Sequence, residues 1–405
     1  MGMPFDEGGN LRRLSMLCER GVTVWGPHRV YIGEDVRLDR ISSGAALLNA
    51  TITGENTFIG SEAQIGTSGL ACIHDAQIGP GTILGAGTYE NCVLLTGAKT
   101  RGFAELRQGT VLEEESEVGH NVGLKNTTLT VGAVAGSQIN FCDVLLTGGS
   151  SRSDHSEIGS GSVHFNFDPR GDKFGSLMGD ARGCLLTARR IFIGGNSGVI
   201  APIHLGFGAV VAAGSIVRTD VGENQLTGGD PPQRRGEYDL ARYFDLSKKF
   251  RTTAKLVGSL HAFRAWYQQV RLRCSSEADR HLYRGASLEF KRHIQHRAKE
   301  LTKVISKLDK SLSKPYKNSE EAAFFGQHRM LLRSIDHINS LLVREEYKEA
   351  PAGFLKEYES LRNQRNHTDS VRALTEEASL TAADWLREIA ARPYVEMRDL
   401  FDAAA

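Results

Sequence analysis

Aliphatic residues recur at every sixth position across much of the first half of this chain of 405 residues. Neither a helix nor an ordinary strand repeats at six residues. A three-sided β-solenoid does, because each flat face takes one hexapeptide and points one aliphatic side chain at the axis. The period therefore predicts a parallel β-helix. The clearest run consists of Ile193, Val199, Leu205, Val211 and Val217.

The repeat extends from about Val30 to about Val221. At roughly 18 residues per coil, this length corresponds to about ten coils. At Gly228–Pro232 glycine and β-branched residues give way to Leu, Ala, Lys, Arg and Glu, which marks a domain boundary. The expected divisions are an N-terminal cap over residues 1–29, a β-helix domain over 30–227, a linker over 228–236 and an all-α helical domain over 237–405.

Beyond the boundary, apolar residues step by three and four, which predicts amphipathic helices. Two such stripes joined by a short loop favour an antiparallel hairpin, and helices near residues 254–274 and 373–391 would complete a bundle. We expect the bundle to cap the open end of the solenoid or to tie subunits together. The stripes are Ile294, Ala298, Leu301, Ile305, Leu308 and Leu312, then Leu331, Ile335, Ile338 and Leu342.

The charge pattern argues against nucleic acid as a partner. The net charge is +1, so the chain has no general attraction to nucleic acid or to an anionic membrane. A basic run lies within the expected helices, and we interpret it as a solvated helix face. The run is Arg271, Arg273, Arg280, Arg284, Lys291, Arg292, Arg297, Lys299 and Lys303.

The cysteines and the N-terminus indicate the compartment. The six cysteines form no CxxC pair, which is typical of reduced thiols and argues against a structural zinc. The first residues lack the apolar core of a signal peptide, and no stretch approaches about 18 consecutive apolar residues. We therefore expect a cytoplasmic protein with no metal and no membrane partner.

Five segments of the solenoid resemble a known family. They are FAELRQG (103–109), VGHNVGLKNTTL (118–129), HFNFD (164–168), FIGGNSGVIAPI (192–203) and VVAAGSIVRTDV (210–221). They resemble the hexapeptide-repeat acyltransferases, in particular the acetyltransferase domain of the bifunctional N-acetylglucosamine-1-phosphate uridyltransferase and glucosamine-1-phosphate acetyltransferase. Stand-alone UDP-N-acetylglucosamine pyrophosphorylase-like proteins are similar too. The resemblance implies a left-handed helix, a homotrimer with sites in the grooves between subunits, and acetyl-CoA or another acyl-CoA as cofactor.

The resemblance also assigns roles to individual residues. Substrate binding falls to Arg107, Lys125, Asn140 and Lys173, and coenzyme binding to Asn166, Phe167, Gly195 and Ala213. A guanidinium and an ammonium across one groove can together neutralise a phosphate. Two alternatives stay open. Arg107 and Lys125 would instead be exterior side chains paired with Glu105, Glu113 or Glu117, and Asn166 would be an inward amide that bridges successive corners.

The chain departs from the family at the chemical centre. Ser137 stands where the family has its catalytic His, and a Ser without a partner base cannot accept a proton as imidazole does near neutral pH. The family's Tyr, Asn and Ser are replaced at Asn140, Glu157 and Gly195. A turn-rich insertion in Leu145–Glu157 suggests a substitute: His155 as the base, oriented by Asp154 or Glu157, near the same groove. His164 and His120 are further candidates, and His204 reads as scaffold.

Three functions follow from this pattern. The first is a transferase-like protein that binds a sugar phosphate or a nucleotide sugar of the UDP-N-acetylglucosamine type and transfers an acyl group from acyl-CoA. The alternative is a non-catalytic nucleotide-sugar sensor or assembly scaffold, with a protein partner bound through the C-terminal helices. The third is a purely structural solenoid. The sequence shows no nucleotidyltransferase signature.

Overall fold

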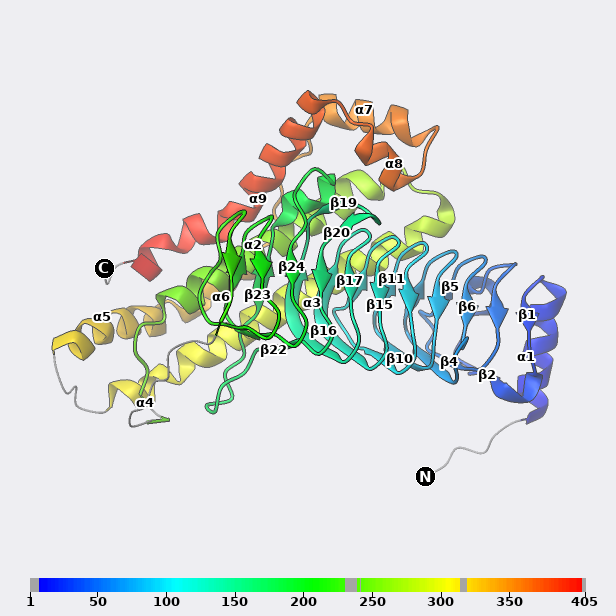
Figure 1. The fold of residues 1–405 in the computed structure, drawn as a ribbon, viewed down its shortest axis with the longest axis horizontal. Coiled ribbons are helices and arrows are strands. Elements are labelled where there is room, and N and C mark those ends of the chain that lie inside the picture. The colour runs from blue at the N-terminus through cyan, green and yellow to red at the C-terminus, as the bar shows by residue number, and fades with distance from the viewer. Residues whose placement is uncertain (1–6, 230–238, 241, 314–318, 403–405) are drawn as a thin grey trace.

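The computed structural model describes residues 7–229, 239–240, 242–313 and 319–402. Short parallel strands stack into a left-handed β-helix, followed by a helical region (Figure 1). One sheet has 11 strands, one from each coil, so the solenoid has about eleven coils. The predicted fold class is confirmed. The predicted linker lies mostly outside the described residues.

The solenoid is a three-sided prism, and each side is a sheet whose strands pair in register with those one coil away. Face 1 is the 11-stranded sheet. It contains β1 (Thr23–Val24), β3 (Ala46–Leu47), β6 (Gln64–Ile65), β9 (Ile83–Leu84), β12 (Lys99–Thr100), β15 (Glu117–Val118), β17 (Val134–Ala135), β21 (Glu157–Ile158), β24 (Phe192–Ile193), β27 (Val210–Val211) and β29 (Leu226–Thr227).

Faces 2 and 3 are joined because β16 and β18 bend around the edge between them. Face 2 contains β2 (Val30–Ile32), β4 (Ala50–Thr53), β7 (Ala71–His74), β10 (Gly87–Glu90), β13 (Ala104–Leu106), the first halves of β16 (Val122–Leu129) and β18 (Ile139–Leu146), β22 (Val163–Phe165), β25 (Gly198–Ile200) and β28 (Ile216–Val217). Face 3 contains β5 (Phe58–Ile59), β8 (Gln77–Ile78), β11 (Val93–Leu94), β14 (Val111–Leu112), the second halves of β16 and β18, β23 (Ser176–Met178) and β26 (His204–Leu205).

The N-terminal end of the prism is covered by α1 (Glu7–Glu19). Leu14 and Leu17 are buried against the apolar residues of the solenoid axis. The Asn10 side chain donates to Val30 O at 2.9 Å and accepts from Ile32 N at 2.9 Å. These bonds satisfy the edge of the first strand of face 2, which would otherwise expose unpaired backbone groups.

The C-terminal region is helical, as predicted. Its elements are α2 (Ser247–Trp266), which continues into a π-helical turn (Tyr267–Arg271), α3 (Glu277–Ser306), α4 (Leu308–Leu312), α5 (Ser319–Arg333), α6 (Ile335–Val343), α7 (Ala352–Arg362), α8 (His367–Arg372) and α9 (Glu376–Asp402). No helix in the described part of the chain is long and apolar enough to cross a lipid bilayer.

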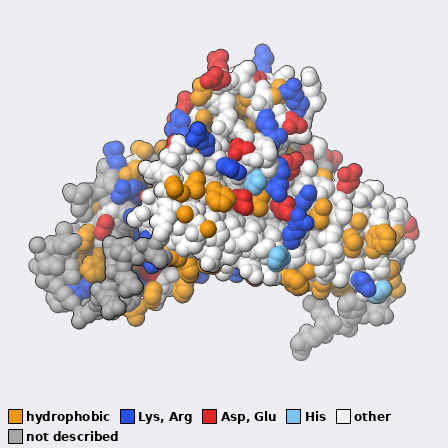
Figure 2. All heavy atoms as spheres, in the orientation of Figure 1, with side chains coloured by type: hydrophobic (Ala, Val, Ile, Leu, Met, Phe, Trp, Pro, Cys, Tyr) orange, Lys and Arg blue, Asp and Glu red, His pale blue; other side chains and the backbone are white. Residues whose placement is uncertain are grey.

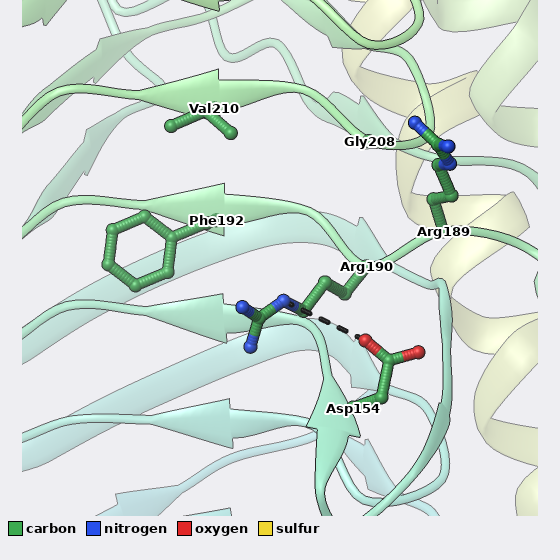
Figure 3. Close-up of a pocket in the computed structure, with 6 residues that line it drawn as sticks. All are labelled: Asp154, Arg189, Arg190, Phe192, Gly208 and Val210. Carbon is green, nitrogen blue, oxygen red and sulfur yellow. Dashed lines mark ion pairs between the residues drawn. The ribbon is translucent and has the colours of Figure 1, made fainter.

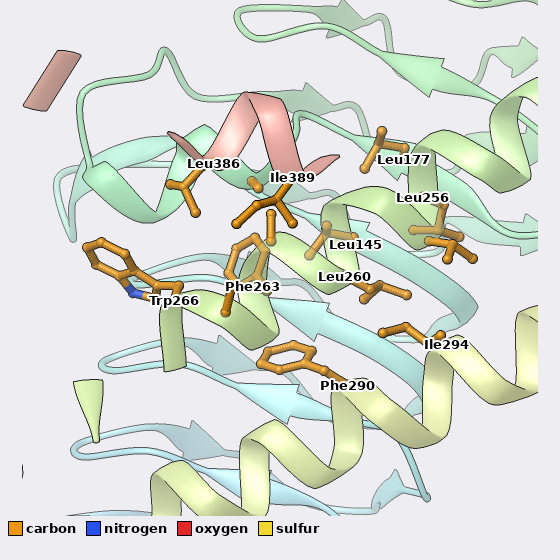
Figure 4. Packing of buried hydrophobic residues seen from close by; sticks show 14 of the residues in the cluster. Leu145, Leu177, Leu256, Leu260, Phe263, Trp266, Phe290, Ile294, Leu386 and Ile389 are labelled. Carbon is orange, nitrogen blue, oxygen red and sulfur yellow. The ribbon is translucent and has the colours of Figure 1, made fainter. Parts of the chain in front are cut away.

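The helices α2 and α3 lie along face 3, so the prediction that the bundle caps the end of the solenoid is wrong for them. Several strands of face 3 have apolar residues at two successive positions, one pointing to the axis and the other outward. A strand buried on both sides reads as a continuous apolar run. The outward set packs with the helices in one buried cluster (Figure 4). That cluster includes Phe58, Val93, Val111, Leu145 and Leu177 of the solenoid and Phe263, Trp266, Phe290 and Ile294 of the helices.

A buried ion cluster fastens α2 to the solenoid. The Arg271 side chain is 0% exposed and donates from Nη1 to Glu113 Oε1 at 3.2 Å and from Nη2 to Glu114 Oε1. The Tyr267 hydroxyl donates to Glu113 Oε1 at 2.7 Å. Burial raises the pKa of Glu113 to about 7, although Arg271 acts in the opposite direction. Arg271 and Arg297 both belong to the basic run of the sequence, and both are buried. The interpretation of that run as a solvated helix face is wrong for these two residues.

We expect Arg271→Ala to lower the free energy of unfolding by about 3–5 kcal/mol, because it leaves Glu114 buried without a counter-charge. The control is Arg273→Ala, since Arg273 forms an ion pair with Glu359 at the surface and such pairs contribute about 0–1 kcal/mol. Urea denaturation measures both losses. Equal, small losses in the two variants would contradict the fastening role of Arg271.

Candidate functional site

Two cations and a thiol stack on face 2 beside its edge with face 3. Lys125 in β16 pairs in register with Cys142 in β18, and the Arg107 amide, just after β13, donates to Leu124 O at 2.9 Å. The three side chains therefore come from successive coils. Arg107 Nη2 lies 3.8 Å from Cys142 Sγ, and its Nε lies 3.7 Å from Glu105 Oε1.

The floor beside these cations is bare. Gly123 lies in register between Glu105 and Asn140 on the outward side of face 2. A Cβ at Gly123 would meet only Asn140 Oδ1 at 3.7 Å and Glu105 Oε2 at 3.9 Å. No side chain therefore fills the space between Glu105 and Asn140 at this position, and Lys125 lies two residues further along the same strand.

The carboxylates that could have neutralised Lys125 are engaged elsewhere. Glu113 is bound to Arg271, and Glu117 forms ion pairs with Arg101 at 2.6 Å and Arg152 at 2.7 Å. Within the described ranges Lys125 has no ion pair. Of the alternative pairings raised by the sequence, the structure contains only the long Arg107 contact with Glu105.

Asp143 joins the solenoid, the loop after β22 and α3 at the edge of face 2. Its Oδ2 accepts from Asn166 Nδ2 at 2.7 Å, and its Oδ1 from Asn126 Nδ2 at 3.1 Å. Arg297 Nη2 lies 3.3 Å and His296 Nε2 3.4 Å from the same Oδ1. Burial alone would raise the pKa of Asp143, but Arg297 and the histidines of α3 outweigh it, and the pKa lies below its ordinary value. Asn166 is thus a bridge between successive corners.

The loop after β22 adds a third cation. Lys173 is exposed, and its carbonyl accepts from Arg297 Nη1 at 3.2 Å. The backbone of Phe167 pairs with that of Lys173 in an isolated antiparallel β-bridge, and Phe167 is 65% exposed. Burial raises the pKa of the Cys142 thiol, while Arg107, Lys125 and Lys173 all lower it. Arg107, Lys125 and Asn140 therefore lie beside Cys142, and Lys173 adds a third positive charge to the surroundings of this thiol.

The other edge of face 2, shared with face 1, carries the remaining coenzyme residues. Ser137, Ser160 and Gly195 stack there in successive corners, since Ser160 Oγ accepts from Ser137 N at 3.0 Å and Ser160 O from Asn196 N at 2.7 Å. Ala213 follows one coil later, against Gly194. The predicted coenzyme set is thus divided, because Gly195 and Ala213 lie on one edge of face 2 and the Asn166–Phe167 pair on the other.

Ser137 has an imidazole partner that we did not expect from the sequence. Its Oγ lies 3.0 Å from Nδ1 of His120, in the preceding corner of the same edge. His120 is exposed and Ser137 is half-buried. Their separation along the chain is close to the roughly 18 residues of one coil. This spacing indicates that the two residues occupy equivalent positions in successive coils and lie in contact. The pair unites a hydroxyl and an imidazole, the elements of acid–base chemistry.

His155 and its neighbours lie on a different side of the prism. They belong to the hairpin of β19 (Gly149–Ser151) and β20 (Asp154–His155), which leads into β21 of face 1. His155 Nδ1 is 2.7 Å from Arg152 O, and its Nε2 is 3.7 Å from Glu157 Oε2. Asp154 instead approaches Arg190, at 3.7 Å. Within one chain the structure does not bring His155 to the cations of face 2.

His164, another candidate base, is buried inside the solenoid. Its Nδ1 is 2.7 Å from Cys142 O and its Nε2 is 2.7 Å from Ser176 Oγ. Burial lowers its pKa to about 4. Both ring nitrogens are therefore occupied in a neutral ring, and His164 acts as a structural residue.

Face 1 carries a hollow of about 540 Å³ near its C-terminal end. Figure 3 shows Arg190 directed at Asp154, with Phe192 and Val210 on adjacent strands. Arg189 stands at the far side and bonds to Asn224 at 2.9 Å. This hollow combines an apolar floor with charged sides and adjoins the His155 hairpin. No group of three His, Cys, Asp or Glu side chains suited to a metal occurs in the described part of the chain.

Comparison with known proteins agrees with the motifs. Bifunctional protein GlmU of Acinetobacter baylyi is 31% identical over 223 residues, covering 53% of this chain and 43% of its own length. Bifunctional protein GlmU of Stutzerimonas stutzeri is 32% identical over 231 residues, covering 55% and 45%. The resemblance to hexapeptide-repeat acyltransferases is confirmed. The chain spans less than half the length of these relatives.

Other comparisons add less. No family model matches the chain. Among solved structures, the polySia specific acetyltransferase NeuO is 16% identical, with a TM-score of 0.21, and the match covers 50% of this chain and 93% of that one.

Proposed function

We propose that the protein is a transferase-like protein that binds a sugar phosphate, or a nucleotide sugar of the UDP-N-acetylglucosamine type, on face 2 and transfers an acyl group to it from acyl-CoA. The observation that carries the proposal is the stack of Arg107 and Lys125 beside the bare floor at Gly123. The similarity of half the chain to GlmU proteins supports the same ligand class.

The phosphate binds between the two cations. Among the described residues Arg107 has only one long contact with a carboxylate, 3.7 Å to Glu105, so its guanidinium is available for a bidentate contact with phosphate oxygens. Lys125 supplies a point charge from the next coil. The sugar lies over Gly123, where Asn140 can bond its hydroxyls.

The coenzyme lies between subunits. Gly195 and Ala213 leave the edge between faces 1 and 2 without bulky side chains, and Phe167 offers an exposed ring on the other edge of face 2. These two sets lie on different edges of one prism. A single coenzyme contacts both when they come from neighbouring chains, so the complete site requires an oligomer, which we infer to be a homotrimer.

The proton acceptor is His120. Lys125 follows His120 in the same coil with Gly123 between them, and five residues at about 3.3 Å each separate their α-carbons by at most about 17 Å. A substrate with its phosphate at Lys125 therefore extends its amino or hydroxyl group toward His120. As that group attacks the thioester carbonyl, the new C–N or C–O bond forms and the C–S bond breaks. His120 takes the proton and passes it to the departing thiolate.

His155 is the second candidate base, and it acts only if a neighbouring chain presents its hairpin to face 2. A non-catalytic sensor or assembly scaffold is the second candidate function, favoured by the loss of the family's His at Ser137. In that case the cations on face 2 bind the ligand and no transfer follows.

We expect Arg107→Ala and Lys125→Ala each to weaken binding of glucosamine 1-phosphate and UDP-N-acetylglucosamine by about 10- to 100-fold, since a bond to a charged group contributes about 1.5–3 kcal/mol. Isothermal titration calorimetry measures the affinities. Lys99→Ala, on face 1, is the matched control and should bind as the wild type does. Unchanged affinity in both face 2 variants would refute the phosphate site.

We expect His120→Ala to lower the turnover of acetyl-CoA with these acceptors by about 10²- to 10⁴-fold without changing acceptor affinity. Ser137→Ala should lower the turnover by a smaller factor, because the hydroxyl positions the ring but does not take the proton. The control is His74→Ala, whose Nδ1 lies 3.0 Å from Thr53 Oγ1 in a similar pair away from the cations. A loss confined to His155→Ala would assign the base to the hairpin instead.

Exposed apolar side chains on the C-terminal coils are the expected subunit interface. Phe192, Val210 and Leu226 are exposed on face 1 and Phe165 on face 2, all in the C-terminal coils, and Figure 2 shows hydrophobic side chains gathered over this part of face 1. Exposed apolar patches of this kind mark interfaces. We expect Val210→Asp to convert trimers into monomers in sedimentation equilibrium, whereas Thr23→Asp, at the N-terminal end of the same face, should not. A monomeric wild type at micromolar concentration would contradict the assembly.

A further inference from the structure

A second cleft lies between α3 and the N-terminal coils, where the helix runs beside the edge of faces 2 and 3. Its volume is about 280 Å³. The helix contributes Arg284 and Arg292, and the turns of the solenoid contribute Arg40, Asn56 and Asn91. With Gln77, which also lines the cleft, three guanidinium groups and three side-chain amides surround one small space.

Two of the three guanidinium groups have no carboxylate partner among the described residues. Arg284 is exposed and forms no ion pair there. Arg40 donates from Nη1 to the carbonyl of Glu55 at 3.2 Å, and its buried Nε has no hydrogen-bond partner in the same residues. Only Arg292 is paired, with Glu289 Oε1 at 2.5 Å, and it also donates to Asn91 Oδ1 at 3.3 Å.

The two carboxylates of the cleft are held by other groups. Asp75 Oδ1 accepts from Asn56 N at 3.0 Å. Glu289 Oε2 accepts from Gly109 N at 2.8 Å, and burial raises its pKa to about 7. Neither carboxylate forms an ion pair with Arg40 or Arg284, so the space between those two side chains carries positive charge. His281 also lines the cleft, and its pKa is lowered first by burial and then by the positive charges of Arg40 and Arg284.

We propose that this cleft binds a small molecule that carries a phosphate group. Guanidinium forks match the geometry of phosphate oxygens, and side-chain amides supply further donors. The volume, at the lower end for ligand pockets, suits a phosphate with a short attached group better than a whole dinucleotide. The site is distinct from the one on face 2 and does not depend on the proposed transfer reaction.

The test uses the full chain carrying both Arg107→Ala and Lys125→Ala, so that the cations of face 2 do not contribute. Inorganic phosphate, pyrophosphate and UMP are titrated by calorimetry. We expect one saturable site for at least one probe, weakened at least tenfold when Arg40→Gln or Arg284→Gln is added. Arg280→Gln, one helical turn earlier on α3, is the matched control and should leave the affinity unchanged.

The outcomes separate clearly. No saturable binding of any probe, or binding that neither Arg40→Gln nor Arg284→Gln weakens, would overturn the proposal. Tighter binding of UMP than of phosphate identifies a nucleotide as the occupant, and equal binding identifies free phosphate. Urea denaturation of each variant distinguishes loss of a ligand contact from loss of folding, and a conservative Arg284→Lys variant should restore part of the affinity.

Discussion

The rest of the structure depends on the packing of α2 and α3 against face 3 of the solenoid. Apolar side chains such as Val93, Val111 and Leu145 point outward there and are buried only because the helices cover them. At about 25 cal/mol per Å² of apolar surface, a stripe of this length contributes many kcal/mol to folding. The buried ion clusters at Arg271 and Asp143 then determine where along the prism the helices lie.

This packing divides the three faces by role. Face 3 is largely covered by the chain's own helices, which leaves faces 1 and 2 for other copies and for the proposed acceptor site. Face 2 carries the cations on one edge and the His120–Ser137 pair on the other, with a glycine between. Because α3 reaches Asp143, the helical region also supports the turn next to Cys142, and folding of the helices is linked to the geometry of the site.

The fold could be predicted because a six-residue period is a local signal and only one architecture repeats that way. The helices could be predicted as well, because the apolar steps of three and four are also a local signal. Their place on face 3 was missed, although the adjacent apolar residues Val93 and Leu94, or Val111 and Leu112, contrast with Glu117 and Val118 on face 1 and indicate a strand buried on both sides. Arg271 and Arg297 looked solvated because their carboxylate partners lie far away in the sequence.

The site was predicted in part. Arg107 and Lys125 come together because equivalent positions of successive coils stack, as the repeat requires, whereas Lys173 lies in the loop after β22, outside the repeat. The same stacking places His120 beside Ser137, one coil earlier. The prediction that Ser137 has no partner base was therefore wrong. The position of His155 could not be foreseen, because the insertion forms a hairpin that leaves the repeat, and the face to which it returns is set by tertiary packing.

The most direct measurement is a crystal structure of the oligomer grown with glucosamine 1-phosphate. We expect the phosphate on face 2, with its oxygens at about 2.7–2.9 Å from Arg107 and Lys125 nitrogens, and the amino group directed at His120. A phosphate bound elsewhere while face 2 stays open to solvent, or a sugar in the reverse orientation, would contradict this expectation.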